Sequence, residues 1–100
     1  MIRGTTPTHT FTIPFDTALI KEVRVVYAQA DTPIVWKETK DCTLEGKTIS
    51  TTLTQEDTLK FDCKKTVQIQ IRVLTTAGEV LSTLVQNIMV EKCLDSEVLA

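Results

Sequence analysis

The stretch VQIQIRV, residues Val67–Val73, decides the fold of this chain. Apolar side chains occupy every second position, and Gln or Arg occupies the positions between them. Successive side chains of a β-strand point to opposite faces of the sheet, so this alternation predicts a strand with one buried and one exposed face. Such a strand needs neighbours in a sheet and a second layer over its apolar face.

The composition of the 100-residue chain agrees with this prediction. Threonine occurs 18 times, valine 10 times and isoleucine 8 times, whereas alanine occurs only 5 times. β-Branched side chains are restricted at χ1 and fit a pleated surface better than a helix. A chain of this length has room for one domain with one core. We therefore expect a single domain built mainly from strands.

Similar alternation predicts further strands on both sides of Val67–Val73. The first is Thr8–Phe15, whose apolar residues alternate with threonine and which contains Pro14, so we expect it to lie at an edge or to end there. The other expected strands are Ile20–Gln29, Ile34–Thr39, the two arms of a hairpin within Cys42–Leu53, and a long final strand from Val80 to about Glu91. The alternation of that final strand slips near Gln86-Asn87, which suggests a bulge or a crossing between sheets.

The connections between these strands are predicted from turn and capping residues. Asp31-Thr32-Pro33 and Glu45-Gly46-Lys47 have the composition of turns. Thr54 and Asp57 have the spacing of a capping box, but no long helical pattern follows, so we expect a single helical turn. Leu59 and Phe61 then begin a short apolar alternation.

About seven strands with regularly spaced turns predict an antiparallel two-sheet sandwich, immunoglobulin-like or a related Greek key. A small β-barrel is the alternative. The expected organisation is a flexible arm at residues 1–7, a sandwich domain at residues 8–92 and a tail at residues 93–100.

The sequence suggests neither catalysis nor a cofactor. His9 is the only histidine, and we expect it to be a solvated side chain near the N-terminus. The cysteines Cys42, Cys63 and Cys93 have no metal or redox spacing and are interpreted as buried or half-buried thiols. Glycines are too scattered for a phosphate loop, and no Asp-x-Asp calcium pattern is present. We expect a protein without catalytic residues, metal or cofactor.

Charge and hydropathy argue against two classes of partner. The net charge of −2 and pI near 5.3 lack the basic excess that nucleic acids or anionic membranes require. The N-terminus has no signal-peptide core, and no apolar run approaches the roughly 18 residues of a membrane span. We therefore expect a protein that begins its life in a cytoplasm and binds neither nucleic acid nor membrane.

The partners that we expect are therefore other proteins. The sequence offers few candidate interface residues. Phe11, Ile13 and Phe15 lie on the uncharged first strand, and Trp36 is a candidate packing anchor. The first strand either pairs within the fold, which we favour, or adds to another chain. Exposure of Trp36 or Tyr27 would instead favour a carbohydrate- or host-surface-binding module.

Three strings give the chain a family resemblance: MIRGTTPTHTFTIPFD at the start, DCTLEGKTISTTLTQEDTLKF in the middle and VQIQIRVLTTAGEVLST near the end. The chain resembles small proteins encoded among the tail and baseplate genes of prophages and phages of Gram-positive gut bacteria. The resemblance implies a virion-associated β-sandwich, made in the host cytoplasm, with other tail or baseplate proteins or its own copies as partners. It implies no catalytic or ligand-binding residues.

Overall fold

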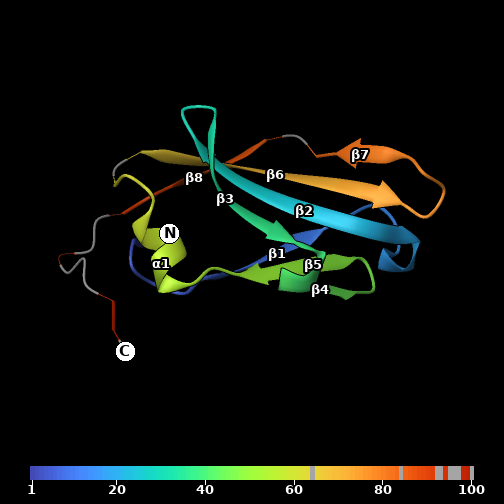
Figure 1. Ribbon diagram of the computed structural model, residues 1–100, viewed down its shortest axis with the longest axis horizontal. Helices are drawn as coiled ribbons and strands as arrows, with labels where there is room; N and C mark the ends of the chain where they lie inside the picture. The colour runs from blue at the N-terminus through green and yellow to red at the C-terminus, as the bar shows by residue number, and fades with distance from the viewer. Residues whose placement is uncertain (64, 84, 92–93, 95–97, 100) are drawn as a thin grey trace.

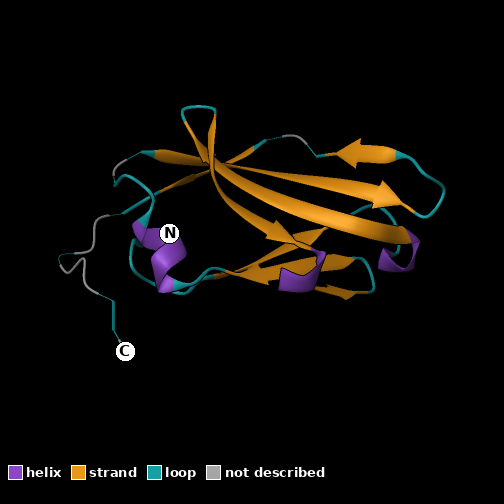
Figure 2. Cartoon of the chain, viewed as in Figure 1, coloured by secondary structure: helices purple, strands orange, loops and turns teal. Residues whose placement is uncertain are grey.

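The computed structural model describes residues 1–63, 65–83, 85–91, 94, 98 and 99. Eight strands form two antiparallel sheets, with two short 3-10 turns and one short α-helix between them (Figures 1 and 2). The elements, in chain order, are β1 (Thr8–Thr12), η1 (Thr17–Leu19), β2 (Ile20–Gln29), β3 (Thr32–Glu38), η2 (Thr39–Asp41), β4 (Cys42–Glu45), β5 (Thr48–Thr52), α1 (Gln55–Leu59), β6 (Thr66–Thr75), β7 (Val80–Ser82) and β8 (Gln86–Met89).

The larger sheet is built around β2 and β6, the two longest strands. Its strand order is β3-β2-β6-β7. β8 pairs with β6 on the same edge as β7, but with the earlier residues of β6. The predicted alternation of β6 is confirmed, because its odd-numbered residues from Val67 to Val73 are buried. They face the apolar residues of β2 in register, with Val25 opposite Ile71 and Tyr27 opposite Ile69. These cross-strand pairs form the centre of the core.

The smaller sheet has the order β1-β5-β4 and covers the apolar face of the larger one. The predicted hairpin within Cys42–Leu53 is confirmed, with Leu44 opposite Ile49 and a two-residue loop at Gly46-Lys47. Gly46 has a φ of 55°, a left-handed conformation that glycine adopts without the steric cost of a Cβ. β1 pairs with β5 on one side only, so it is an edge strand that ends before Pro14, as predicted.

The strand order is that of an immunoglobulin-type Greek key. The sheet β1-β5-β4 corresponds to the order B-E-D, and β3-β2-β6-β7 corresponds to C′-C-F-G. Two separate sheets confirm the predicted sandwich rather than the alternative barrel. In the part of the chain that the structure describes, no named strand occupies the place of strand A, beside the free edge of β1.

The turn between β2 and β3 differs from the prediction. Ala30 and Asp31 both have positive φ, at 50° and 61°, and β3 begins at Thr32. Two successive residues of positive φ are typical of a tight hairpin turn, although Ala is an unfavourable residue there. Gln68 stabilises this turn, because its side chain accepts from the Asp31 N–H and donates to the Asp31 carboxylate.

The predicted helical turn is confirmed as α1. The Thr54 hydroxyl accepts from the Asp57 N–H, and the Asp57 carboxylate accepts from the Thr54 N–H, which completes the capping box. The alternation expected from Leu59 does not form a strand. Leu59 is the last residue of the helix, and Phe61 is buried in the core directly after it.

The final strand is broken into β7 and β8. β7 pairs with Arg72–Leu74 of β6, and β8 pairs with Thr66–Ile69. The irregularity predicted near Gln86-Asn87 is therefore a break in the strand, and it lies between the end of β7 at Ser82 and the start of β8 at Gln86. The Thr83 hydroxyl accepts from the Ile71 N–H, and the Thr83 N–H donates to the Ile71 carbonyl, so part of the ladder continues through the break.

Residues 1–7 pack against the domain, whereas the sequence predicts a flexible arm. Ile2 forms a parallel bridge with Glu91, and the Arg3 side chain donates to the carbonyl oxygens of Leu59 and Phe61. The buried Thr58 hydroxyl accepts from the Gly4 N–H and donates to the Thr5 carbonyl. Because the end of α1 leaves carbonyl groups without helical partners, a cation placed there is favoured.

The expected C-terminal tail of residues 93–100 is described only at Leu94, Val98 and Leu99. The main chain of Leu99 exchanges two hydrogen bonds with the Gln55 side chain. The rest of the tail, and the predicted domain boundary at residue 92, lie outside the described residues.

Replacement of Thr58 by Val tests the docking of residues 1–7. The variant leaves the Gly4 N–H and Thr5 carbonyl without their partner, so we expect the free energy of unfolding to fall by about 1–3 kcal/mol in urea denaturation. The Gly4 amide should exchange slowly with solvent in the wild type and faster in the variant. Unchanged stability, together with fast Gly4 exchange in the wild type, would instead indicate a free arm.

Candidate interaction surfaces

The structure separates the predicted interface residues into two groups. Phe11 and Ile13 belong to the core, with exposed fractions of 9% and 5%, and Phe15 is half-buried against it. The prediction that Phe11 and Ile13 bind a partner is corrected by this burial, because the apolar face of β1 is turned toward the larger sheet. Trp36 is different: it is 51% exposed on β3.

Trp36 lies on the outer face of the larger sheet, opposite Val26 in register. In the adjacent row of the same face, Glu38 lies opposite Arg24, and Arg24 lies opposite Arg72. Trp and Arg are enriched in protein interfaces, where both supply large contact areas. The outer face around Trp36 is therefore a candidate interaction surface.

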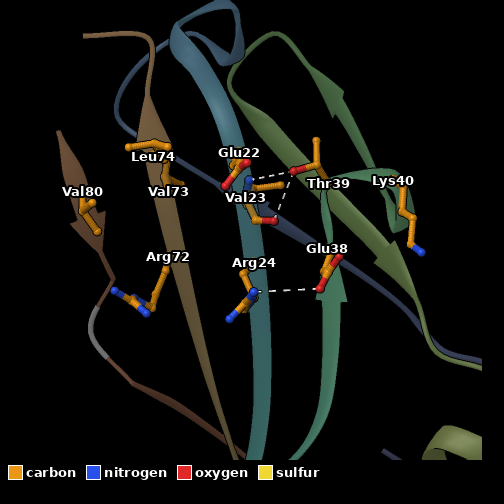
Figure 3. A pocket seen from close by; sticks show the side chains of 10 residues that line it. All are labelled: Glu22, Val23, Arg24, Glu38, Thr39, Lys40, Arg72, Val73, Leu74 and Val80. Carbon is orange, nitrogen blue, oxygen red and sulfur yellow. Dashed lines mark hydrogen bonds and ion pairs between the residues drawn. The ribbon is translucent and has the colours of Figure 1, made fainter. Parts of the chain in front are cut away.

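A shallow hollow of about 560 Å³ lies on this face, with Arg24, Glu38 and Arg72 among the residues that line it (Figure 3). Figure 3 shows Arg24 directed toward Glu38, with an ion-pair distance of 3.8 Å, and Arg72 directed away from Arg24. Like charges directly opposite each other in a sheet destabilise it, and the exposed pair with Glu38 offsets this only weakly. Among the described residues, no carboxylate lies within ion-pair distance of Arg72.

Exposed apolar side chains gather along β7 and β8, which the sequence analysis missed as a surface. Their exposed fractions lie between 40% and 58%. The residues are Val80, Leu81, Val85 and Met89. The available signal was the loss of strict alternation after Val80, since apolar residues then occur at both odd and even positions. The part of the sheet that carries these residues is therefore a candidate interaction surface.

An apolar cavity joins this edge to the end of β1. It has a volume of about 210 Å³ and lies between the segment from Ile13 to Phe15 and the segment from Leu81 to Thr83. Ile71 and Val73 form its floor. The free edge of β1 and the β7–β8 edge therefore lie on the same side of the sandwich, which we call the open side.

His9, on the inner face of β1, forms a polar contact that the sequence does not predict. Its Nδ1 lies 2.9 Å from the hydroxyl oxygen of Tyr27. His9 is half-buried and contacts the fully buried Tyr27, so it is not the solvated side chain that the sequence predicts, and Tyr27 offers no platform for a sugar. Burial lowers the pKa of His9, and the positive N-terminus lowers it further. Burial raises the pKa of Tyr27, with Cys42 and Asp57 adding to the effect.

A second polar contact joins β3 to α1. The Lys37 ammonium lies 2.6 Å from the Asp57 carboxylate, and both side chains are largely buried. Burial alone would raise the pKa of Asp57, but hydrogen bonds from Lys37 and from the Thr54 N–H lower it below its ordinary value. Asp57 therefore serves both as helix cap and as counter-ion, and both roles are structural.

The described cysteines match the predicted half-buried thiols. Cys42 and Cys63 are free and of intermediate exposure, whereas Cys93 lies outside the described residues. Burial raises the pKa of Cys42, and Asp41 also raises it, which disfavours the thiolate that nucleophilic chemistry requires. Within the described ranges, no three His, Cys, Asp or Glu side chains group as metal ligands. The described helices include none with the length and apolar character of a membrane span.

Acidification tests the buried position of His9. Its folded-state pKa lies below the unfolded value near 6.5, so the unfolded chain takes up the proton first. The contribution of neutral His9 to the free energy of unfolding is complete above pH 6.5 and is lost as the pH falls through the pKa of His9 in the folded state. We expect urea denaturation to show lower stability at pH 5 than at pH 7.5, with His9→Gln reducing that difference. An identical pH dependence in both proteins would contradict burial of a neutral His9.

Comparison with known proteins does not assign a role to these surfaces. No family model matches the chain, and neither a curated protein nor a solved structure matches it. Evidence for function therefore comes from the exposed residues themselves.

Proposed function

We propose that this protein is a non-enzymatic structural or adaptor component that acts by protein–protein assembly. The observation that carries the proposal is the group of exposed apolar side chains on and beside β7 and β8, of which Leu81 lines an apolar cavity next to the end of β1. Burying such residues against another protein is favourable by roughly 25 cal/mol per Å² of apolar surface. A domain with one small core gains little stability from apolar side chains that stay exposed to water.

The resemblance of the sequence to tail and baseplate proteins supports a more specific form of this proposal. In that form, the protein is part of a phage tail or baseplate, assembled in the host cytoplasm from copies of itself and other tail proteins. Repeated copies in a symmetric particle supply avidity, so each contact need not be strong. The resemblance supports this setting, and the exposed surface supports the mode of action.

Light scattering coupled to size exclusion tests assembly. We expect a discrete oligomer of the 11.2 kDa chain over a range of concentrations. The double variant Val85→Glu/Met89→Glu should shift the mass toward the monomer, because it places charges on the apolar edge. Thr43→Glu, on an exposed position of β4, is the matched control and should keep the wild-type mass. A wild type that stays monomeric at every concentration would contradict self-assembly.

Carbohydrate binding is the second candidate, because Trp36 is half exposed on the outer face, the face that also carries the hollow. Flat aromatic rings stack on sugars, and Trp36 is the single tryptophan, so its fluorescence reports on this face alone. We expect no saturable change when glucose, galactose or N-acetylglucosamine oligosaccharides are added at millimolar concentrations. A saturable change that disappears in Trp36→Ala would favour the carbohydrate-binding function.

A further inference from the structure

The free edge of β1 presents main-chain groups that pair with no other described residue. The Ile13 N–H donates to the Lys47 carbonyl, and the Leu53 N–H donates to the Pro7 carbonyl, each at 2.9 Å. Hydrogen-bonded pairs alternate along an antiparallel ladder, so the odd-numbered residues of β1 are those bonded to β5. The N–H and C=O groups of the even-numbered threonines, Thr8, Thr10 and Thr12, therefore point away from β5 along the open edge.

This edge lacks the features that usually protect edge strands. β1 carries only threonine, a neutral histidine and phenylalanine. Two other edge strands are blunted: β3 contains Pro33, Lys37 and Glu38, and β4 is four residues long and ends in Glu45. Proline, charge and short length all hinder the addition of another strand. Within Thr8–Thr12, β1 contains neither proline nor an acidic or lysine side chain.

The symmetry of β1 favours a second copy as the occupant. If a two-fold axis passes beside Thr10, this residue lies opposite Thr10 of the second copy, and Thr8 lies opposite Thr12 of the second copy. Every one of these residues has its free N–H and C=O on the open side, so each pair can exchange two hydrogen bonds. The edge is uncharged, so the pairing brings no like charges together.

The size of the open side is sufficient for a stable contact. The molecule measures 46 × 29 × 16 Å, and its strands run along the long axis (Figure 1). A side that contains this axis has an area of at least the order of 700 Å², close to the roughly 800 Å² per partner of a specific interface. Leu81, which is 40% exposed on β7, lines the apolar cavity on this same side, and a second copy would cover it.

We infer that β1 pairs antiparallel with β1 of a second copy about a two-fold axis at Thr10, which joins the two smaller sheets into one. The main-chain hydrogen bonds of the even-numbered threonines set the register, and Leu81 with the apolar cavity that it lines supplies buried area. This inference rests on the proposed assembly function and names the second copy as its first partner.

Replacement of Thr10 by Pro tests the pairing. Proline removes an N–H that points away from β5, so the ladder between β1 and β5 should remain and circular dichroism should be native. We expect the dissociation constant of the dimer to rise at least 100-fold, as measured by light scattering. Thr10→Val keeps the N–H and the β-branched shape, and this control should dimerise like the wild type.

Cysteine cross-linking tests the register independently of proline. In a Cys42→Ser/Cys63→Ser/Cys93→Ser background, Thr10→Cys should form a disulfide-linked dimer under mild oxidation, because residues paired across such a ladder have Cα atoms about 5.5 Å apart. Thr12→Cys faces Thr8 of the second copy and should not cross-link.

The outcomes separate this inference from the proposed function. A wild-type oligomer that persists in natively folded Thr10→Pro, or equal cross-linking by Thr12→Cys and Thr10→Cys, would overturn pairing through β1 and leave assembly in place. A wild type that is monomeric at every concentration would overturn self-assembly altogether. Should Thr10→Pro fail to fold, the comparison of the two cysteine variants decides the question.

Discussion

The pairing of β2 with β6 is the constraint on which the rest of the structure depends. It places the apolar residues of both strands directly opposite one another, as in the pair Val23 and Val73. A shift of one residue would turn every one of these side chains to the solvent face. With this register fixed, β3, β7 and β8 can add only at the flanks, and the smaller sheet must cover the apolar face.

The unequal size of the two sheets follows from this arrangement and accounts for the open side. The larger sheet has five strands and the smaller has three. The smaller sheet ends at β1, so the larger sheet extends past it toward β7 and β8, and the apolar cavity lies at this margin. The short parallel contact of Ile2 with Glu91 closes the margin near α1 only. The remaining length presents the free edge of β1 and the partly exposed side chain of Leu81.

Much of the fold can be predicted from the sequence, because a strand with one buried face shows a local alternation of apolar and polar residues. The strands from Ile20 to Gln29 and around Val67–Val73, the hairpin at Gly46 and the cap at Thr54 all carry such local signals. The turn at Ala30 carries none, since Ala is not a typical residue of positive φ. Its conformation depends on Gln68, which is distant in the sequence.

The candidate surfaces were harder to predict, because exposure depends on which face a second layer covers. Alternation identifies two faces of β1 and of β3, but it does not show that Phe11 is turned to the core whereas Trp36 is turned to solvent. The contact of His9 with Tyr27 leaves no local signal in the sequence, because Tyr27 lies on another sheet. The docking of Arg3 on the carbonyl groups at the end of α1 likewise depends on contacts between distant segments.

Amide hydrogen exchange along β1, measured at several protein concentrations, tests the account most directly. The amides of Thr8, Thr10 and Thr12 should exchange fast in dilute protein and slowly in concentrated protein. The amides of His9 and Phe11, which are bonded to β5, should be protected at both concentrations. Exchange of the three threonine amides that does not depend on concentration would contradict an open side that serves assembly through β1.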